Sequence, residues 1–203
     1  MLRKYVTFIL VTAIFTLATP ARLYQGIVMN SAETIEPWNF KLGVAPTLIF
    51  GKDGADNVLG ISGKAGLGLT HRVDVEFTGA IFDNYSYFGI DAEYWAFKGP
   101  NVNISGAVGW HMTNFELGAD SSGIDATLLA STRPVNNLEI TGAVKFSFDH
   151  FGDIDRTATL GHFVPGLEYK ISPRVDALAE FGIALTDDSW NYLSFGLAYY
   201  FRQ

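Results

Sequence analysis

Apolar and polar residues alternate with a period of two in one strand-length segment after another, from residue 38 to the end of the chain. In residues 73–77, for example, the sequence Val-Asp-Val-Glu-Phe places three apolar side chains on one face and two acids on the other. Successive side chains of a β-strand point to opposite faces, so this pattern predicts strands with one apolar and one polar face. Ten such segments follow each other, which predicts an all-β chain.

No apolar run after the first twenty residues is long enough for a membrane-spanning helix, which needs about 20 such residues. The chain is nevertheless 48% hydrophobic, and the alternation disperses this apolar content over the ten segments. A chain of this kind crosses a membrane as a closed barrel, because an open sheet edge is not tolerated in lipid. The predicted fold is therefore a single closed antiparallel transmembrane β-barrel over residues 38–203. Ten strands fit the pattern best, with eight or twelve as alternatives.

The connections between these segments alternate between tight and longer forms. The tight connections are residues 71–72, 98–101, 133–137 and 172–174. The longer ones are residues 51–57, 83–86, 113–123, 149–157 and 186–191. Short periplasmic turns and longer extracellular loops are the expected asymmetry of an outer-membrane barrel. Pro46 and Pro165 fall inside two predicted strands, and we expect a bulge or a position near the rim at each.

Large aromatic residues gather towards the strand ends, with aliphatic residues between them, as in the interfacial girdles of transmembrane barrels. The predicted girdle residues are Trp38, Tyr94, Trp110, Phe148, Tyr169, Trp190, Tyr199 and Phe201. Phe82, Tyr85, Phe151 and Tyr192 are expected at the longer-loop end as well. A soluble barrel that binds a small apolar ligand is the rival at the level of the fold, and it would concentrate its aromatics in the middle of the core-facing stripe.

The N-terminus has the features of a secretory signal peptide. Arg3 and Lys4 are followed by an apolar stretch over residues 5–18 and by small residues that allow cleavage after Ala21. Residues 1–21 are therefore predicted to be removed on export, and residues 22–37 to form a short periplasmic lead-in.

The composition excludes several classes of partner and site. Without Arg3 and Lys4 the chain has 12 basic and 21 acidic residues, a formal charge of −9. This charge argues against nucleic acid as a partner. The absence of Cys excludes disulfides and thiolate metal sites. No metal site and no cofactor are predicted.

Residues 192–201, Tyr-Leu-Ser-Phe-Gly-Leu-Ala-Tyr-Tyr-Phe, resemble the last strand of Gram-negative outer-membrane proteins, and residues 170–176 resemble their periplasmic turns. This resemblance to the small porin-like class implies a location in the cell outer membrane. It also implies contact with outer-membrane lipid and lipopolysaccharide, and recognition of the last strand by the barrel-insertion machinery. The family usually ends on the aromatic residue, whereas Arg202 and Gln203 follow Phe201 here. The pattern identifies no subfamily and predicts no oligomeric state.

The polar stripe is expected to line the lumen. It comprises Lys41, Lys64, Asp74, Glu76, Asp91, Glu93, Glu139, Lys145, Glu168, Lys170, Asp176 and Glu180. Ten strands enclose only a modest lumen, so these residues form either an ion-pair network that fills it or the wall of a narrow, cation-preferring pore. The predicted function is porin-like passage of small solutes or ions, without enzymatic activity, and a structural barrel with an occluded lumen is the alternative.

A third alternative is an outer-membrane hydrolase with Asp and His residues at its rim. Asp149, His150, Asp187 and Asp188 all fall near the predicted outer rim, with His111 at similar height. A His beside carboxylates can activate water. No complete catalytic motif accompanies these residues.

Overall fold

A computed structural model describes residues 31–116, 120–152 and 155–201, and it confirms the predicted fold: ten antiparallel strands form one closed barrel. The strands are β1 (Phe40–Ile49), β2 (Val58–Gly68), β3 (Val73–Phe82), β4 (Tyr85–Lys98), β5 (Asn103–Phe115), β6 (Ser121–Val135), β7 (Leu138–Phe151), β8 (Arg156–Ser172), β9 (Val175–Ala184) and β10 (Tyr192–Phe201). No helix in the described ranges is long and apolar enough to cross a membrane.

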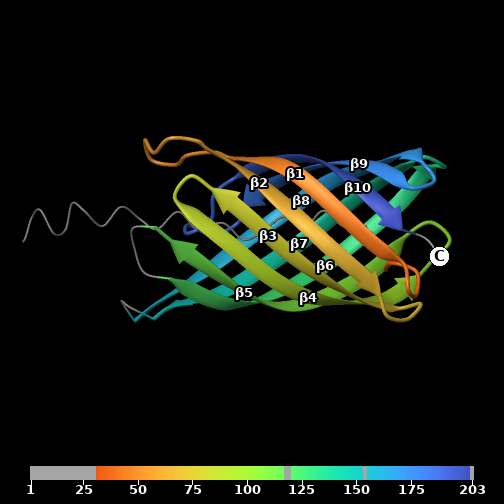
Figure 1. Ribbon diagram of the computed structural model, residues 1–203, viewed down its shortest axis with the longest axis horizontal. Coiled ribbons are helices and arrows are strands. Elements are labelled where there is room, and N and C mark those ends of the chain that lie inside the picture. The colour runs from red at the N-terminus through yellow and green to blue at the C-terminus, as the bar shows by residue number, and fades with distance from the viewer. Residues whose placement is uncertain (1–30, 117–119, 153–154, 202–203) are drawn as a thin grey trace, which may run out of the picture.

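Each strand pairs with its neighbours in sequence, and β1 closes the barrel against β10. The closing pair runs from Phe40 opposite Phe201 to Ile49 opposite Tyr192. The strands are tilted against the long axis of the barrel, and the C-terminal strand ends at the right-hand end in Figure 1. Closure leaves the sheet without an edge, so the backbone groups of every strand have a partner strand on both sides.

The alternation in sequence becomes an apolar exterior and a polar interior. On β6, for instance, Ile124 is 60% exposed, whereas the next residue, Asp125, is 1% exposed. Large apolar side chains are exposed on the outer side of all ten strands. This distribution is the reverse of a soluble barrel and is that of a transmembrane barrel, whose outer face contacts lipid.

Short and long connections lie at opposite ends, which we call the short-turn end and the loop end. The chain's C-terminal strand ends at the short-turn end, together with the turns after β2, β4, β6 and β8. At the loop end, the predicted connection 83–86 is reduced to Asp83 and Asn84, because Tyr85 and Ser86 already belong to β4. Strand β5 likewise continues to Phe115, beyond its expected end.

The two prolines lie inside strands and cause no bulge, so the bulge that was one of the two expectations for them is absent. Pro46 pairs with Ile61 of β2, but the ladder between β1 and β10 omits Ala45 and Pro46. Pro165 pairs with Gly142 of β7, and the ladder between β8 and β9 omits Val164 and Pro165. The register is the same on both sides of each gap, so each proline interrupts one ladder without shifting it.

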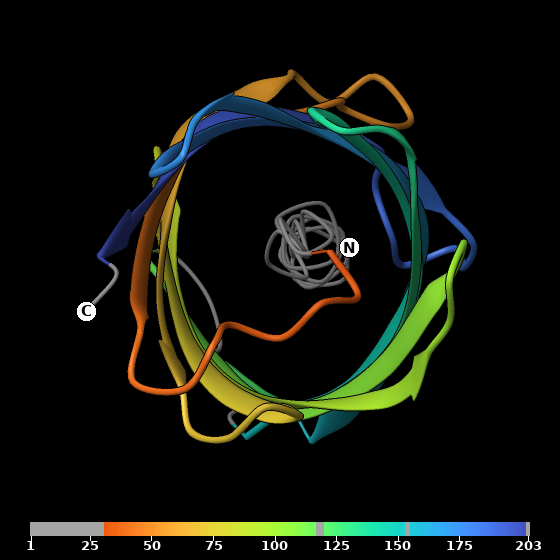
Figure 2. The ribbon, with the colours of Figure 1, turned by 90° about the vertical axis from the view of Figure 1, so that its right-hand side faces the viewer.

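The described part of the predicted lead-in, residues 31–37, lies in the mouth of the barrel at the short-turn end. Figure 2 looks into this end and shows the segment running from the middle of the lumen to the wall. Trp38 makes the turn into the wall with a φ of 64°, which is uncommon for a non-glycine residue. Its backbone N–H donates to the Gly68 carbonyl at 2.8 Å. The predicted signal peptide and residues 22–30 fall outside the described residues.

Gly66 and Gly68 on the inner face of β2 leave the room that this segment needs. A Cβ at Gly68 would collide with the backbone of Ile35 and Glu36, and one at Gly66 would collide with the Ile35 side chain. The wall is therefore shaped to receive residues 35 and 36 at close range.

Candidate functional site

The structure places all twelve predicted lumen residues on the inner face of the barrel. Nine of them are buried, and Asp91, Glu168 and Lys170 are half-buried. They do not form one group. Seven of them gather in the short-turn half, whereas Lys145 belongs to a second group nearer the loops; the seven are Lys41, Asp74, Glu76, Glu93, Glu168, Lys170 and Asp176.

Glu76 is the centre of the group in the short-turn half of the lumen. Its carboxylate lies 2.7 Å from the Lys41 ammonium and 2.8 Å from the Lys64 ammonium. Strands β1, β2 and β3 supply the three side chains, and adjacent registers bring them together. A carboxylate with two buried ammonium partners is well compensated, so this triad fastens three neighbouring strands from the inside.

Asp125 is the centre of the group in the loop half. It lies 3.2 Å from His111 Nδ1 and 3.3 Å from Lys145 Nζ, and it also accepts hydrogen bonds from Tyr87 and Ser147. The other ring nitrogen of His111 lies 2.9 Å from Asp149. The imidazole is thus held between two carboxylates. The contacts of Asp125 and His111 therefore link strands β4 to β7.

A collar of aromatic side chains, Phe82, Tyr85, Tyr87, Phe115, Phe151 and Tyr192, lines the inner face at the loop end. Phe82 stacks on Tyr85 with ring centroids 4.8 Å apart, and Tyr87 stacks on His111 at 5.3 Å. Phe82, Tyr85, Phe151 and Tyr192 were expected in the outer girdle, and their inward position corrects that expectation. Position along the strand was predicted well, but the alternation turns these side chains inward.

Trp190 also departs from the predicted girdle. It lies in the loop after β9, where the alternation does not extend, and it is buried with the collar. Its carbonyl lies 2.8 Å from His162 Nε2. The other seven predicted girdle residues are exposed on the outside of the barrel: Trp38, Tyr94, Trp110, Phe148, Tyr169, Tyr199 and Phe201.

The lead-in is fastened to the wall by polar contacts. The Ile35 N–H donates to Asp74 at 2.8 Å, and the Ala32 N–H donates to the Ser131 hydroxyl at 3.3 Å. Glu33 accepts from Asn103 at 2.9 Å and lies 3.3 Å from the Arg133 guanidinium. Arg133 also lies 2.5 Å from Glu139. Residues 32–35 are therefore tied to strands β3, β5 and β6.

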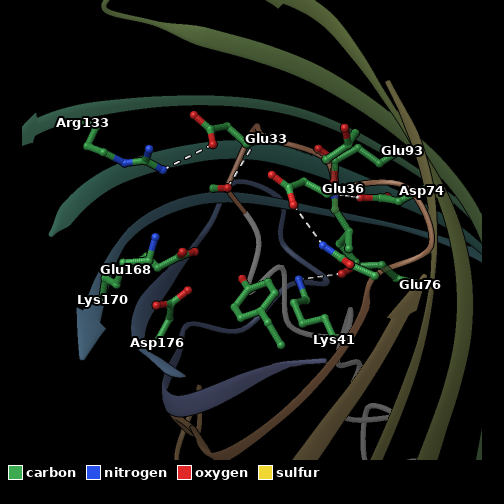
Figure 3. A pocket seen from close by; sticks show the side chains of 15 residues that line it. Glu33, Glu36, Lys41, Asp74, Glu76, Glu93, Arg133, Glu168, Lys170 and Asp176 are labelled. Atoms are coloured by element: carbon green, nitrogen blue, oxygen red, sulfur yellow. Dashed lines mark hydrogen bonds and ion pairs between the residues drawn. The ribbon is translucent and has the colours of Figure 1, made fainter. Parts of the chain in front are cut away.

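A cavity of about 280 Å³ lies between the lead-in and the wall, and we call it the mouth cavity. Its charged lining comprises Glu33, Glu36, Lys41, Asp74, Glu76, Glu93, Arg133, Glu168, Lys170 and Asp176. Figure 3 shows these side chains around a common space, with Glu168 and Asp176 on one side and Asp74 and Glu93 on the other. Seven carboxylates face three cations, so the lining has an excess of acidic groups.

The predicted rim group of Asp and His residues is assembled only in part. His111 and Asp149 face the lumen together, but His150 is exposed on the opposite face of β7. Asp188 instead pairs with Arg156 at 3.1 Å.

Sequence reasoning missed several residues of this site. Asp125 stood on the inward stripe of a predicted strand and could have been included. Arg133 was assigned to a turn, whereas β6 continues to Val135 and carries it inward. Nothing in residues 31–36, Ser-Ala-Glu-Thr-Ile-Glu, indicates that Glu33 turns back into the barrel.

Comparisons with known proteins place this fold among outer-membrane barrels. An outer membrane channel from Pseudomonas putida F1 superposes with a TM-score of 0.57 over 86% of this chain and 100% of its own, at 9% identity. The KdgM porin gives a TM-score of 0.50, with 80% and 99% of the two chains covered and 9% identity. No family model and no curated protein sequence matches the chain. The likeness therefore concerns the fold, which this chain shares with outer-membrane channels and porins.

Proposed function

We propose that this protein is inserted in the bacterial outer membrane and forms a narrow channel for small cations. The excess of carboxylates around the mouth cavity carries the proposal. A lumen lined by one sign of charge raises the local concentration of counter-ions and repels ions of its own sign. The apolar exterior and the fold shared with outer-membrane channels support the location and the class of function.

Conductance in a planar bilayer tests the proposal directly. Purified protein refolded in detergent is expected to give discrete steps, with a reversal potential in a KCl gradient that indicates cation preference. Glu168→Gln removes one carboxylate from the mouth cavity and should reduce that preference. Asp56→Asn, in the exposed loop after β1, should leave it unchanged. Preference for chloride in the unaltered protein would refute the proposal.

An occluded barrel with a structural role is the second candidate, because residues 31–36 occupy part of the mouth. It predicts a correctly folded protein that resists denaturation in detergent and yet gives no conductance steps. Such a result would shift attention from the lumen to the loops.

A further inference from the structure

The carboxylates of the mouth cavity outnumber the cations that compensate them within the barrel. Lys41 is engaged by Glu76, and Arg133 by Glu33 and Glu139. The third cation, Lys170, lies opposite Asp176 in the ladder between β8 and β9. Five further carboxylates line the space: Asp74, Glu93, Glu168 and Asp176 on the wall, and Glu36 on the lead-in, which accepts a hydrogen bond from Asn39.

Two of these carboxylates are incompletely partnered. Asp74 and Asp176 are 2% and 4% exposed, and in each side chain Oδ1 has no hydrogen-bond partner among the described residues. A buried carboxylate oxygen without a donor is costly, because it has lost water and gained nothing in exchange. These oxygens line a cavity large enough to hold a small molecule, so the site lacks donors that a bound cation would supply.

The arrangement does not suit a metal ion. A divalent cation needs several oxygens that converge on one point, and no group of three Asp, Glu or His side chains in the described ranges has that arrangement. Here the carboxylates stand on opposite walls, Asp74 and Glu93 on β3 and β4, and Glu168 and Asp176 on β8 and β9 (Figure 3). Two separated acidic pairs match a ligand with two separated positive charges.

We propose that the mouth cavity binds a small organic diamine. One ammonium group would donate to Asp176 and Glu168, and the other to Asp74 and Glu93. Each ammonium has three N–H donors, which can satisfy the oxygens that lack partners. This assignment rests on the proposed passage of cations and names the class of solute that the channel takes.

Calorimetric titration of the full chain in detergent with 1,4-diaminobutane tests the assignment. We expect one site, and butylamine and CaCl2 should each bind at least tenfold more weakly. Asp176→Asn removes a charge-assisted hydrogen bond and should weaken diamine binding about tenfold. Asp56→Asn is the control that retains the cavity. Equal affinity of the Asp176→Asn and Asp56→Asn variants, or Ca²⁺ binding as tight as that of the diamine, would overturn the assignment.

Lys170→Gln gives a result that a folding defect cannot mimic. It removes a competing cation from the same wall, so diamine binding should become severalfold tighter, whereas a damaged barrel would bind more weakly. Weaker or unchanged binding by this variant would count against the site. The two measurements can fail independently. A barrel that binds the diamine but gives no conductance steps refutes the channel alone. A cation-selective channel whose diamine affinity is unchanged by Asp176→Asn refutes the diamine site alone.

Discussion

The two halves of the lumen follow the same alternation but are built from different residue types. The loop half is lined by the aromatic collar above a carboxylate, Asp125, that has four polar partners. The short-turn half has an excess of carboxylates, a cavity and a segment of chain lying across it. One half therefore gains stability from aromatic packing and from the partners of Asp125, whereas the lining of the other half has more carboxylates than cations.

Truncation of one tyrosine in each half should give the largest difference in the free energy of unfolding between the two halves. Tyr192 and Tyr200 both point inward from β10, and Tyr192 lies in the collar while Tyr200 lines the mouth cavity. Tyr192→Ala should reduce the free energy of unfolding by about 3–5 kcal/mol, as is typical of a buried aromatic residue. Tyr200→Ala should reduce it by about 1 kcal/mol, because its ring already borders empty space. Urea unfolding in detergent measures both, and equal losses would contradict the contrast.

Neutralising two neighbouring acids should distinguish compensated from surplus charge within the short-turn half. Glu76→Gln leaves Lys41 and Lys64 buried without their counter-ion, and we expect a loss of about 3 kcal/mol. Glu93→Gln removes a charge whose neighbours Asp74 and Glu76 are also acids, and it keeps the buried volume and one oxygen acceptor, so the loss should be at most about 1 kcal/mol or stability should rise. Unfolding midpoints of the two variants give the comparison. A large loss for Glu93→Gln would mean that this carboxylate is compensated after all.

Displacing the lead-in should have the smallest effect on stability and a visible effect on conductance. Gly68→Val places a side chain where Ile35 and Glu36 now lie, so the segment should leave the mouth and single-channel conductance should rise about twofold or more. Gly79→Val is the control on the outer face of β3, where a new Cβ meets nothing within 4 Å and cannot reach the lead-in. An unchanged conductance in the Gly68→Val variant would show that residues 31–36 do not limit the pore.

The wall of the barrel could be predicted from the sequence because strand geometry fixes the period of two. Asp74 and Glu76 were placed inside for that reason. The aromatic collar could have been predicted equally well: Phe82 follows Ile81, an outward residue, and so had to point inward. Its height along the strand suggested a girdle, but the face of the strand decided its role. The buried position of Trp190 was harder to predict, because no periodicity extends into its loop.

The mouth cavity could be predicted only in part. Its wall residues stood on the polar stripe, but its floor is the lead-in, whose contacts depend on tertiary structure alone. The space that Gly66 and Gly68 provide is visible only once Ile35 lies against them. The cavity is formed between two segments, and the alternation describes only one of them.

Pro46 and Pro165 indicate where neighbouring strands of the barrel wall can separate. The two ladders that they interrupt, β1 with β10 and β8 with β9, are the two that border the β9–β10 hairpin. The gaps lie opposite residues 195–196 and 181–182 of that hairpin, so backbone pairing is interrupted on both sides of the hairpin. Amide exchange is fastest where backbone pairing is sparse. We therefore expect amide exchange in the middle of the wall to be fastest along the two borders of the C-terminal hairpin, where the barrel opens most readily.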